Sequence, residues 1–181
     1  MTGPAARPAT ERARQILAAA RTLLEREGPD ALTMRRLAGS VGLTAPSLYK
    51  HFPDKSSVVH ALADAMLRET ADVLEAAEAA APGSFSALAA AYRAHALAHP
   101  HLYRLTTGHP LQKDLEERAA APLFRALAGD EGRARAAWAF AHGMVVMELN
   151  GRFPTDTDVA TAWTAGIAAF APDAGAAGTS P

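Results

Sequence analysis

The sequence predicts an all-α fold, and three features of its composition and spacing support this. Alanine, leucine, arginine and glutamate dominate the 181 residues, β-branched residues are sparse, and no segment alternates strictly between apolar and polar residues. Apolar residues recur instead at intervals of three and four positions, and glycine and proline separate the segments that carry them. We therefore expect helices and no sheet.

Two helices are predicted before residue 43. The first is expected over 10–27, with Thr10 as its N-cap and Gly28 as its C-terminal stop. The second follows Thr33, which can cap it, and ends at Gly42 after about two turns. A long helix followed by a short one is therefore expected at the start of the chain.

A third and a fourth helix follow closely. The third is expected from the N-cap Thr44 to about His51, with Pro46 in its first turn, where a missing amide hydrogen costs nothing. Asp54 is expected to cap a long fourth helix, which Pro82–Gly83 ends.

The remaining chain is divided by glycine and proline into five further candidate helices, at 84–98, 101–107, 111–128, 131–151 and 156–170. Pro122 is expected to break or kink the third of these. The last residues, 172–181, are mostly alanine, glycine, serine and proline and are expected to form a disordered tail.

The charge is distributed unevenly along the chain. The formal net charge is −1, but residues 1–60 hold nine Lys/Arg against five Asp/Glu, which gives +4 and leaves −5 for the remainder. A small basic module joined to an acidic body is therefore predicted. Such a module is a candidate for binding a polyanion.

Several classes of protein are excluded by what the sequence lacks. There is no cysteine, so a disulfide framework, a thiolate nucleophile and a cysteine-ligated metal are ruled out. No apolar run approaches the roughly 20 residues of a membrane span, and the start has no apolar segment of a secretory signal. We expect a soluble, cytoplasmic protein with no membrane partner.

The two short helices and the turn at Gly42 have the size and order of a helix-turn-helix. In the second of them, Leu48 and Phe52 lie four positions apart and can anchor the helix to a core. The other faces of this helix then carry small residues near its start and hydrogen-bonding residues near its end. This arrangement suits a helix in the major groove of DNA, whose first turn approaches base edges while later side chains reach phosphates.

These residues resemble the DNA-binding domain of the TetR family. The resemblance covers about residues 10–70 and is carried by 32–38, 41–44, 47–52 and Lys55. It implies a homodimeric, all-helical transcriptional regulator, usually a repressor, whose third helix is the recognition helix. A two-fold dimer also implies a palindromic double-stranded operator.

The resemblance implies a set of DNA-binding residues. They are Thr33, Arg35, Thr44, Ala45, Pro46, Ser47, Tyr49, Lys50, His51 and Lys55. Ala45 departs from the family pattern, because alanine offers only an apolar contact, for instance to a thymine methyl group. Two alternatives stay open: Arg35 can instead be a solvated surface residue, and Tyr49 can instead be a packing residue.

A second resemblance lies in the C-terminal half. Trp138, His142, Gly143, Glu148 and Gly151 resemble the Trp-His-Gly type of TetR C-terminal domain. This resemblance implies that the last two helices pair with their symmetry mates in a four-helix dimer interface. The residues expected there are Phe140, Met144, Val145, Trp163 and Ile167.

Residues with an apolar body and a polar tip recur between these helices and can line a pocket for a small-molecule inducer. The candidates are Tyr92, His95, Tyr103, Trp138 and His142. Each can instead be an ordinary core or rim residue. His95 and His99 could also hold a metal with His101 or His109, although no carboxylate or cysteine completes such a site by its spacing.

The sequence thus predicts an all-α protein with an N-terminal three-helix, helix-turn-helix DNA-binding domain at 10–70 (motif about 33–52) and a helical ligand-binding and dimerisation domain at 71–171. The predicted function is a ligand-responsive, sequence-specific transcriptional regulator, most simply a repressor that an inducer releases from its operator. No metal site, cofactor or catalytic residue is predicted. The alternative is a helical metal- or ligand-binding protein or enzyme whose helix-turn-helix is only a scaffold.

Overall fold

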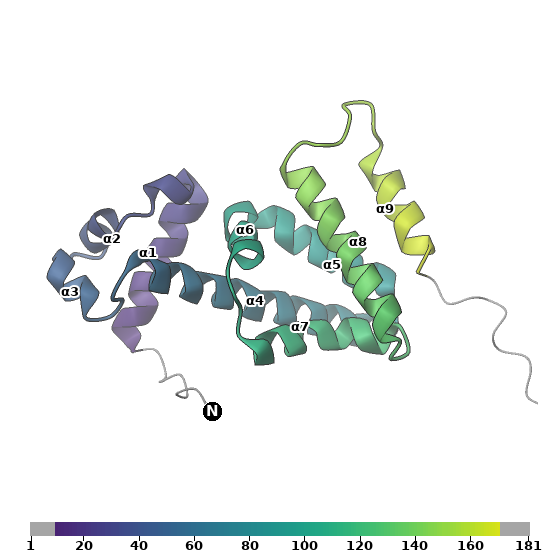
Figure 1. The fold of residues 1–181 in the computed structure, drawn as a ribbon, viewed down its shortest axis with the longest axis horizontal. Coiled ribbons are helices and arrows are strands. Elements are labelled where there is room, and N and C mark those ends of the chain that lie inside the picture. The colour runs from purple at the N-terminus through teal and green to yellow at the C-terminus, as the bar shows by residue number, and fades with distance from the viewer. Residues whose placement is uncertain (1–9, 171–181) are drawn as a thin grey trace, which may run out of the picture. The chain divides into compact units, whose positions relative to one another are not determined.

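The computed structural model describes residues 10–170, which fold into helices with no strand among them (Figure 1). The predicted all-α class is confirmed. The predicted tail at 172–181, and residue 171 of the predicted second domain, lie outside the described residues.

The predicted helices all form. The first four are α1 (Glu11–Glu27), α2 (Met34–Ser40), α3 (Ala45–Tyr49) and α4 (Lys55–Ala80), and a single 3-10 turn, Pro29–Ala31, follows α1. The others are α5 (Phe85–Ala98), α6 (Pro100–Gly108), α7 (Lys113–Ala126), α8 (Glu131–Leu149) and α9 (Val159–Ala168).

The caps explain several of these boundaries. Thr10 Oγ1 accepts a hydrogen bond from the Ala13 amide and begins α1, and Gly28, with a φ of +82°, ends it. Asp158 caps α9 by accepting from two backbone amides, so α9 begins three residues later than the sequence predicted. Pro122 does not interrupt α7, which continues through it to Ala126.

The described chain forms two compact units, and α4 contributes to both. The first unit comprises residues 10–66 and 99–111, and the second comprises 67–98 and 112–170. The predicted boundary at residue 70 therefore lies close to the division on α4. The prediction had placed α6 in the second domain, whereas α6 packs on α1 in the first unit.

The first unit has an apolar core of its own. Its fully or nearly fully buried side chains are Ile16, Leu24, Leu32, Leu37, Leu48, Val58, Leu62, Met66 and Leu102. Nδ1 of His99 lies 2.6 Å from Oε1 of Glu25, which ties the start of α6 to α1. Burial of this kind holds the short helices α2 and α3, which are too short to be stable alone.

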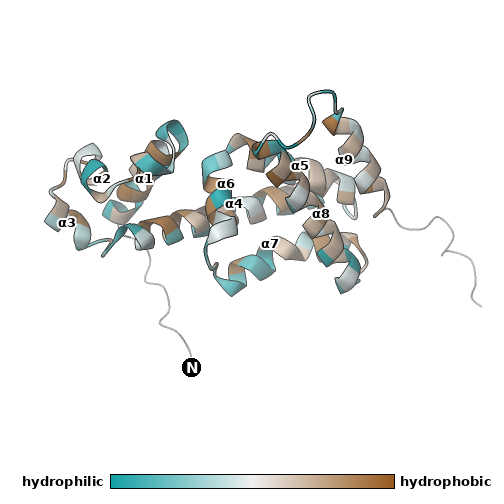
Figure 2. Cartoon of the chain, turned by 45° about the horizontal axis from the view of Figure 1, so that its top comes forward, coloured by the Kyte–Doolittle hydropathy of each residue, from teal (hydrophilic) through white to brown (hydrophobic). Residues whose placement is uncertain are grey.

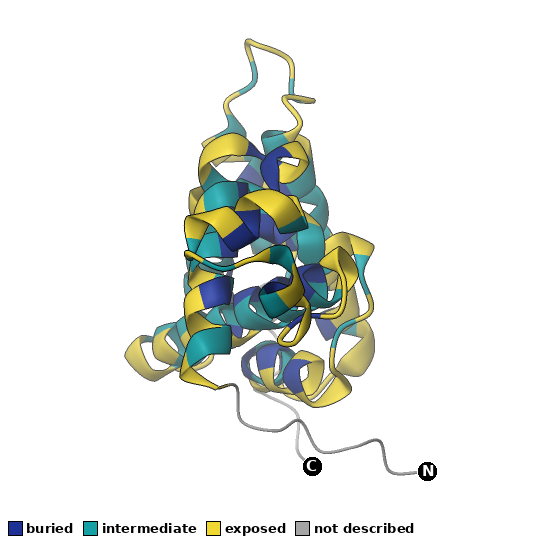
Figure 3. Ribbon diagram, turned by 90° about the vertical axis from the view of Figure 1, so that its left-hand side faces the viewer, coloured by how far each residue is buried: buried dark blue, intermediate teal, exposed yellow. Residues whose placement is uncertain are grey.

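The second unit is built around α5, α7, α8 and α9. Its core side chains include Phe85, Leu88, Leu115, Pro122, Ala137, Ala141, Val145 and Trp163. The first turns of α7 are hydrophilic, and the apolar residues of this helix lie further along (Figure 2). The connection between α8 and α9 is mostly exposed (Figure 3).

Across residues 10–170, no helix combines the length and the hydrophobicity that a membrane span requires.

Candidate nucleic-acid interface

The turn between α2 and α3 is fixed by backbone hydrogen bonds. The Leu43 amide donates to the carbonyl of Ala38 (2.9 Å) and the Gly42 amide donates to that of Gly39 (3.2 Å). Gly42 has a φ of +64°, the left-handed conformation that ends helices in this pattern and that glycine adopts without steric cost. At the other end of α2, Thr33 Oγ1 accepts from the Arg36 amide at 3.2 Å. The helix-turn-helix is therefore capped at both ends of α2.

Two apolar side chains anchor α3 to the first unit, as predicted from the sequence. Leu48 has no exposed area and Phe52 is 8% exposed. On the opposite side, the Tyr49 ring is 48% exposed, and Pro46 and Lys50 are exposed as well. This exposure leaves the Tyr49 side chain available to a partner of α3.

The structure places the predicted DNA-binding residues on one continuous segment and on the helix that precedes it. Eight of them are exposed: Thr33, Arg35, Thr44, Pro46, Tyr49, Lys50, His51 and Lys55. Ala45 and Ser47 are half-buried, and the hydroxyls of Thr44 and Ser47 lie 3.0 Å apart. The first turn of α3 therefore presents small side chains.

Lys55 is the first residue of α4, where free backbone amides favour an anion. Its Nζ donates to the carbonyl of Pro29 at 3.3 Å, which holds the ammonium group near the start of the helix. Asp54 precedes it, and Oδ1 of Asp54 accepts from the Ser57 amide at 2.7 Å. The acidic side chain is thus engaged in capping the helix.

Two arginine contacts in this unit were not predicted from the sequence. Nη2 of Arg12 donates to the carbonyl of Val41 at 3.2 Å, and Nη2 of Arg36 donates to Oε2 of Glu27 at 2.8 Å. Both contacts connect α1 with α2 or with the turn after it. No local pattern could reveal them, because Arg12 and Val41 lie 29 residues apart.

The predicted charge asymmetry is retained in the folded units. The described part of the first unit holds nine Lys/Arg and six Asp/Glu, a net charge of +3. The described part of the second holds eight and twelve, a net charge of −4. The exposed face of α3 thus belongs to the basic unit, which favours a polyanionic partner.

The predicted pocket residues are distributed over both units. Tyr103 is buried within the first unit. Tyr92 and His95 lie half-buried on α5 of the second unit, and His142 lies half-buried on α8. The Trp138 side chain is 55% exposed and stacks on His142, with ring centroids 5.4 Å apart. Partial burial lowers the pKa of the His142 imidazole below its ordinary value.

The predicted interface residues are likewise divided by the structure. Val145 has no exposed area and Trp163 is 4% exposed, so both belong to the core of the single chain. Phe140 packs edge-on against Trp163, with ring centroids 5.5 Å apart. Met144 and Ile167 are half-buried.

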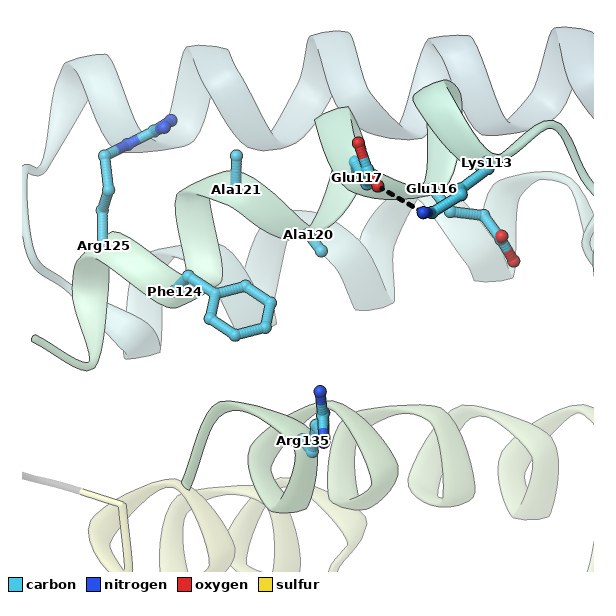
Figure 4. Close-up of a pocket in the computed structure, with 8 residues that line it drawn as sticks. All are labelled: Lys113, Glu116, Glu117, Ala120, Ala121, Phe124, Arg125 and Arg135. Carbon is cyan, nitrogen blue, oxygen red and sulfur yellow. Dashed lines mark ion pairs between the residues drawn. The ribbon is translucent and has the colours of Figure 1, made fainter. Parts of the chain in front are cut away.

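A wide, shallow groove of about 750 Å³ lies between α7 and α8 (Figure 4). Its lining residues are Lys113, Glu116, Glu117, Ala120, Ala121, Phe124, Arg125 and Arg135. Phe124 extends from α7 toward α8, and Arg135 extends from α8 toward α7. None of the predicted pocket residues is among those that line it.

A metal centre finds no support within the described residues 10–170. No group of three or more histidine, aspartate or glutamate side chains is close enough there to hold a metal ion.

Comparison with known proteins agrees with the helix-turn-helix geometry. Residues 16–62 match the family described as "Bacterial regulatory proteins, tetR family", and residues 85–170 match "Tetracyclin repressor-like, C-terminal domain". An uncharacterised HTH-type transcriptional regulator of Mycobacterium tuberculosis, Rv0681, is 33% identical over 161 residues, which cover 81% of this chain and 74% of the relative.

Solved structures show the same fold. A protein of unknown function from Rhodococcus sp. RHA1 superimposes with a TM-score of 0.73 and 27% identity, covering 93% of this chain and 97% of that one. A TetR variant from Acinetobacter baumannii AYE, in complex with minocycline, gives a TM-score of 0.62 and 25% identity over 87% of this chain and 92% of that one.

The fold and the exposed recognition helix define a helix-turn-helix transcriptional regulator. The chain belongs to the TetR family of bacterial regulatory proteins, and it is a ligand-responsive DNA-binding regulator of that class. The matching description of the C-terminal half does not separate subtypes, so the Trp-His-Gly type stays a prediction.

Proposed function

We propose that this regulator is a repressor, which binds a palindromic operator as a homodimer and leaves it when a small molecule binds the second unit. The observation that carries the proposal is the exposed polar end of α3 in a unit of net charge +3. There Tyr49, Lys50 and His51 extend from a helix whose other face is anchored by Leu48. A basic surface on an anchored short helix is what the major groove of DNA accepts.

Each part of this surface has a proposed role. Ala45, Pro46 and Ser47 form the first turn of α3 and approach base edges, and Ala45 supplies an apolar contact to a thymine methyl group. Thr33, Thr44, Tyr49, His51 and Lys55 bind phosphates, whereas Arg35 and Lys50 contact bases or the neighbouring backbone. In a dimer, the two α3 helices would lie about 34 Å apart, in successive major grooves.

The DNA proposal is tested by selecting bound sequences from random double-stranded DNA and measuring fluorescence anisotropy over a salt series. Lys55→Ala is expected to weaken binding to operator and scrambled DNA alike and to reduce the salt slope by about one. Lys113→Ala removes the charge of another exposed lysine, in the second unit, and serves as the control; Nζ of Lys113 lies 3.5 Å from Oε1 of Glu117. If Lys55→Ala and Lys113→Ala both bind as wild type does, the proposed interface is wrong.

The dimer interface is proposed on the outward face of α8. Gly143 and Met147 lie on this face, four residues apart: Met147 is 40% exposed, and a β-carbon on Gly143 would meet no atom within 4 Å. Trp138 is 55% exposed but lies on the opposite side of the helix from Met147, because nine residues separate the two. Apolar residues on the solvent side of a helix favour a second helix as their partner. Phe140, Met144 and Ile167 border this face, whereas the buried Val145 and Trp163 support it from within the chain.

The inducer site is proposed in the second unit, beside the half-buried polar residues Tyr92, His95 and His142. The compound must favour one conformer of the regulator, because equal affinity for both would shift nothing. We propose that it moves α4, which runs from Lys55 at the DNA interface into the second unit. A screen for compounds that lower DNA anisotropy tests this, and hits should lose their effect in Tyr92→Ala but retain it in Lys113→Ala.

The proposed regulator acts in the cytoplasm, as a binding protein and not an enzyme, and it requires no cofactor. Membership in a family of transcriptional regulators supports this view.

A further inference from the structure

Two carbonyl groups near the end of α2 accept hydrogen bonds from backbone amides of the turn that follows. Ala38 accepts from the Leu43 amide and Gly39 accepts from the Gly42 amide, which closes the turn. The carbonyl of Val41, two residues after Gly39, is bound from outside the motif by Nη2 of Arg12 at 3.2 Å. A side chain of α1 therefore holds the backbone three residues before Thr44, the N-cap of α3.

The guanidinium group of Arg12 is itself held in place. Its Nη1 donates to Oε1 of Gln15 at 2.9 Å, one turn further along α1, and the residue is half-buried. The planar guanidinium group carries several donors in fixed directions. The hydrogen bond from Nη1 to Gln15 therefore directs Nη2 toward the carbonyl of Val41. Its positive charge also lies at the C-terminal end of α2, where the helix dipole favours a cation.

We propose that Arg12 is a positioning residue for recognition, which sets the orientation of α3 on the first unit through the Val41 carbonyl. This inference rests on the proposed DNA interface at α3. Contacts to base edges require accurate placement of the recognition helix, whereas nonspecific attraction to phosphates depends mainly on charge. Loss of the Arg12 bond should therefore reduce the discrimination between operator and scrambled DNA more than it reduces nonspecific binding.

Arg14 provides a matched control on the same helix. Its Nη2 pairs with Oε2 of Glu11 at 2.7 Å within α1, and its side chain is 67% exposed. Arg14→Gln and Arg12→Gln each remove one positive charge from the first turn and a half of α1. Only Arg12→Gln removes a contact with the turn before α3.

The experiment measures anisotropy with operator DNA selected by the wild-type protein and with scrambled DNA, for wild type, Arg12→Gln, Arg12→Lys and Arg14→Gln. Arg12→Gln is expected to lower the ratio of operator to scrambled affinity by about tenfold, whereas Arg14→Gln should leave the ratio unchanged. Arg12→Lys keeps the charge but not the fork, so it should keep the wild-type salt slope and still lose discrimination. Circular dichroism of each variant checks that helical content is retained.

The outcomes separate this inference from the proposed interface. The positioning role is wrong if Arg12→Lys has the wild-type ratio of operator to scrambled affinity and Arg12→Gln has the same ratio as Arg14→Gln. Arg12 would then contribute its charge alone. If Arg12→Gln unfolds, Arg12→Lys alone decides between the two roles. If wild type itself does not discriminate, the proposed DNA interface fails as well.

Discussion

Glu148 on α8 accepts a bidentate pair of hydrogen bonds from Arg93 on α5: Nη2 donates to Oε2 at 2.7 Å and Nε donates to Oε1 at 2.9 Å. The same carboxylate accepts from Nε1 of Trp163 on α9, and the Arg93 guanidinium lies over the Trp163 ring. The Glu148 side chain therefore joins its own helix, α8, to α5 and α9 of the second unit. Its side chain is only 12% exposed, so these bonds are shielded from competing water.

Replacing Glu148 should destabilise the second unit. Glu148→Ala leaves the Arg93 cation and the Trp163 indole N–H without their acceptor, at a cost of about 2–3 kcal/mol. Glu131→Ala serves as the control, because Glu131 pairs with Arg135 on the surface and should cost at most about 1 kcal/mol. Urea unfolding followed by Trp fluorescence measures both, and equal midpoints for the two variants would contradict the assigned role.

Gly166 should be intolerant of a side chain. A β-carbon at this position would overlap Cε2 and Cζ of Phe140 on α8. The Phe140 ring cannot move aside freely, because it packs against Trp163 and Phe170. Gly166→Ala should therefore destabilise the protein by about 1–3 kcal/mol despite the better helix propensity of alanine.

Gly39→Ala is the matched control for this prediction. It lies inside α2, where a β-carbon would meet no atom within 4 Å, so alanine should stabilise the helix by up to about 1 kcal/mol. Thermal unfolding should thus shift in opposite directions for the two substitutions. A stabilised Gly166→Ala would show that α9 does not pack closely on α8.

Much of the fold could be predicted from the sequence because its signals are local. Thr10, Thr33 and Asp54 act as the expected N-caps, and the anchors Leu48 and Phe52 are buried as their spacing implied. Pro122 was expected to break or kink its helix, but α7 continues through it, because the sequence does not distinguish a tolerated proline from one that ends a helix. The association of α6 with α1 depends on contacts between distant residues, such as Glu25 with His99, which no local pattern contains.

The exposure of the candidate site residues agrees with the sequence analysis on α3 and agrees least on α8. Apolar residues occur on every side of that helix, so the sequence does not show which of them faces the core. Val145 was assigned to the dimer interface on this basis, although its side chain is completely buried in the single chain. Met147, which is exposed, was not among the residues expected to form that interface.

This correction changes the expected effect of charges on α8. Val145→Glu should unfold the second unit, because an unpaired carboxylate in the core costs about 3–5 kcal/mol. Met147→Glu should leave the protomer folded and separate the dimer, which sedimentation velocity would report as a monomer. Leu97→Glu is the control, since Leu97 is comparably exposed at 36% but lies on α5. A stable dimer in Met147→Glu would remove the proposed interface.

Arg118 and Arg125 on α7 pair with three acidic residues on α4. Nη2 of Arg118 lies 2.6 Å from both Asp72 and Glu75, and Arg125 binds Glu78 through two nitrogens at 2.6 Å. The hydrogen bonds from Arg118 and Arg125 are the main cause that lowers the pKa of Glu75 and of Glu78 below the ordinary value of 4.5. These pairs lie within the second unit and join α7 to the part of α4 that belongs to this unit.

The lowered pKa values predict how stability depends on pH. As pH falls, the unfolded chain binds protons at Glu75 and Glu78 first, near pH 4.5, so the stabilisation is complete above this pH and is lost as pH falls through the folded pKa values. The melting temperature should therefore fall less steeply between pH 5 and about pH 3 in a variant carrying Arg118→Gln and Arg125→Gln than in wild type. Because the pairs are exposed, salt should screen the difference. Identical pH profiles at low salt would show that these pairs do not stabilise the packing of α7 on α4.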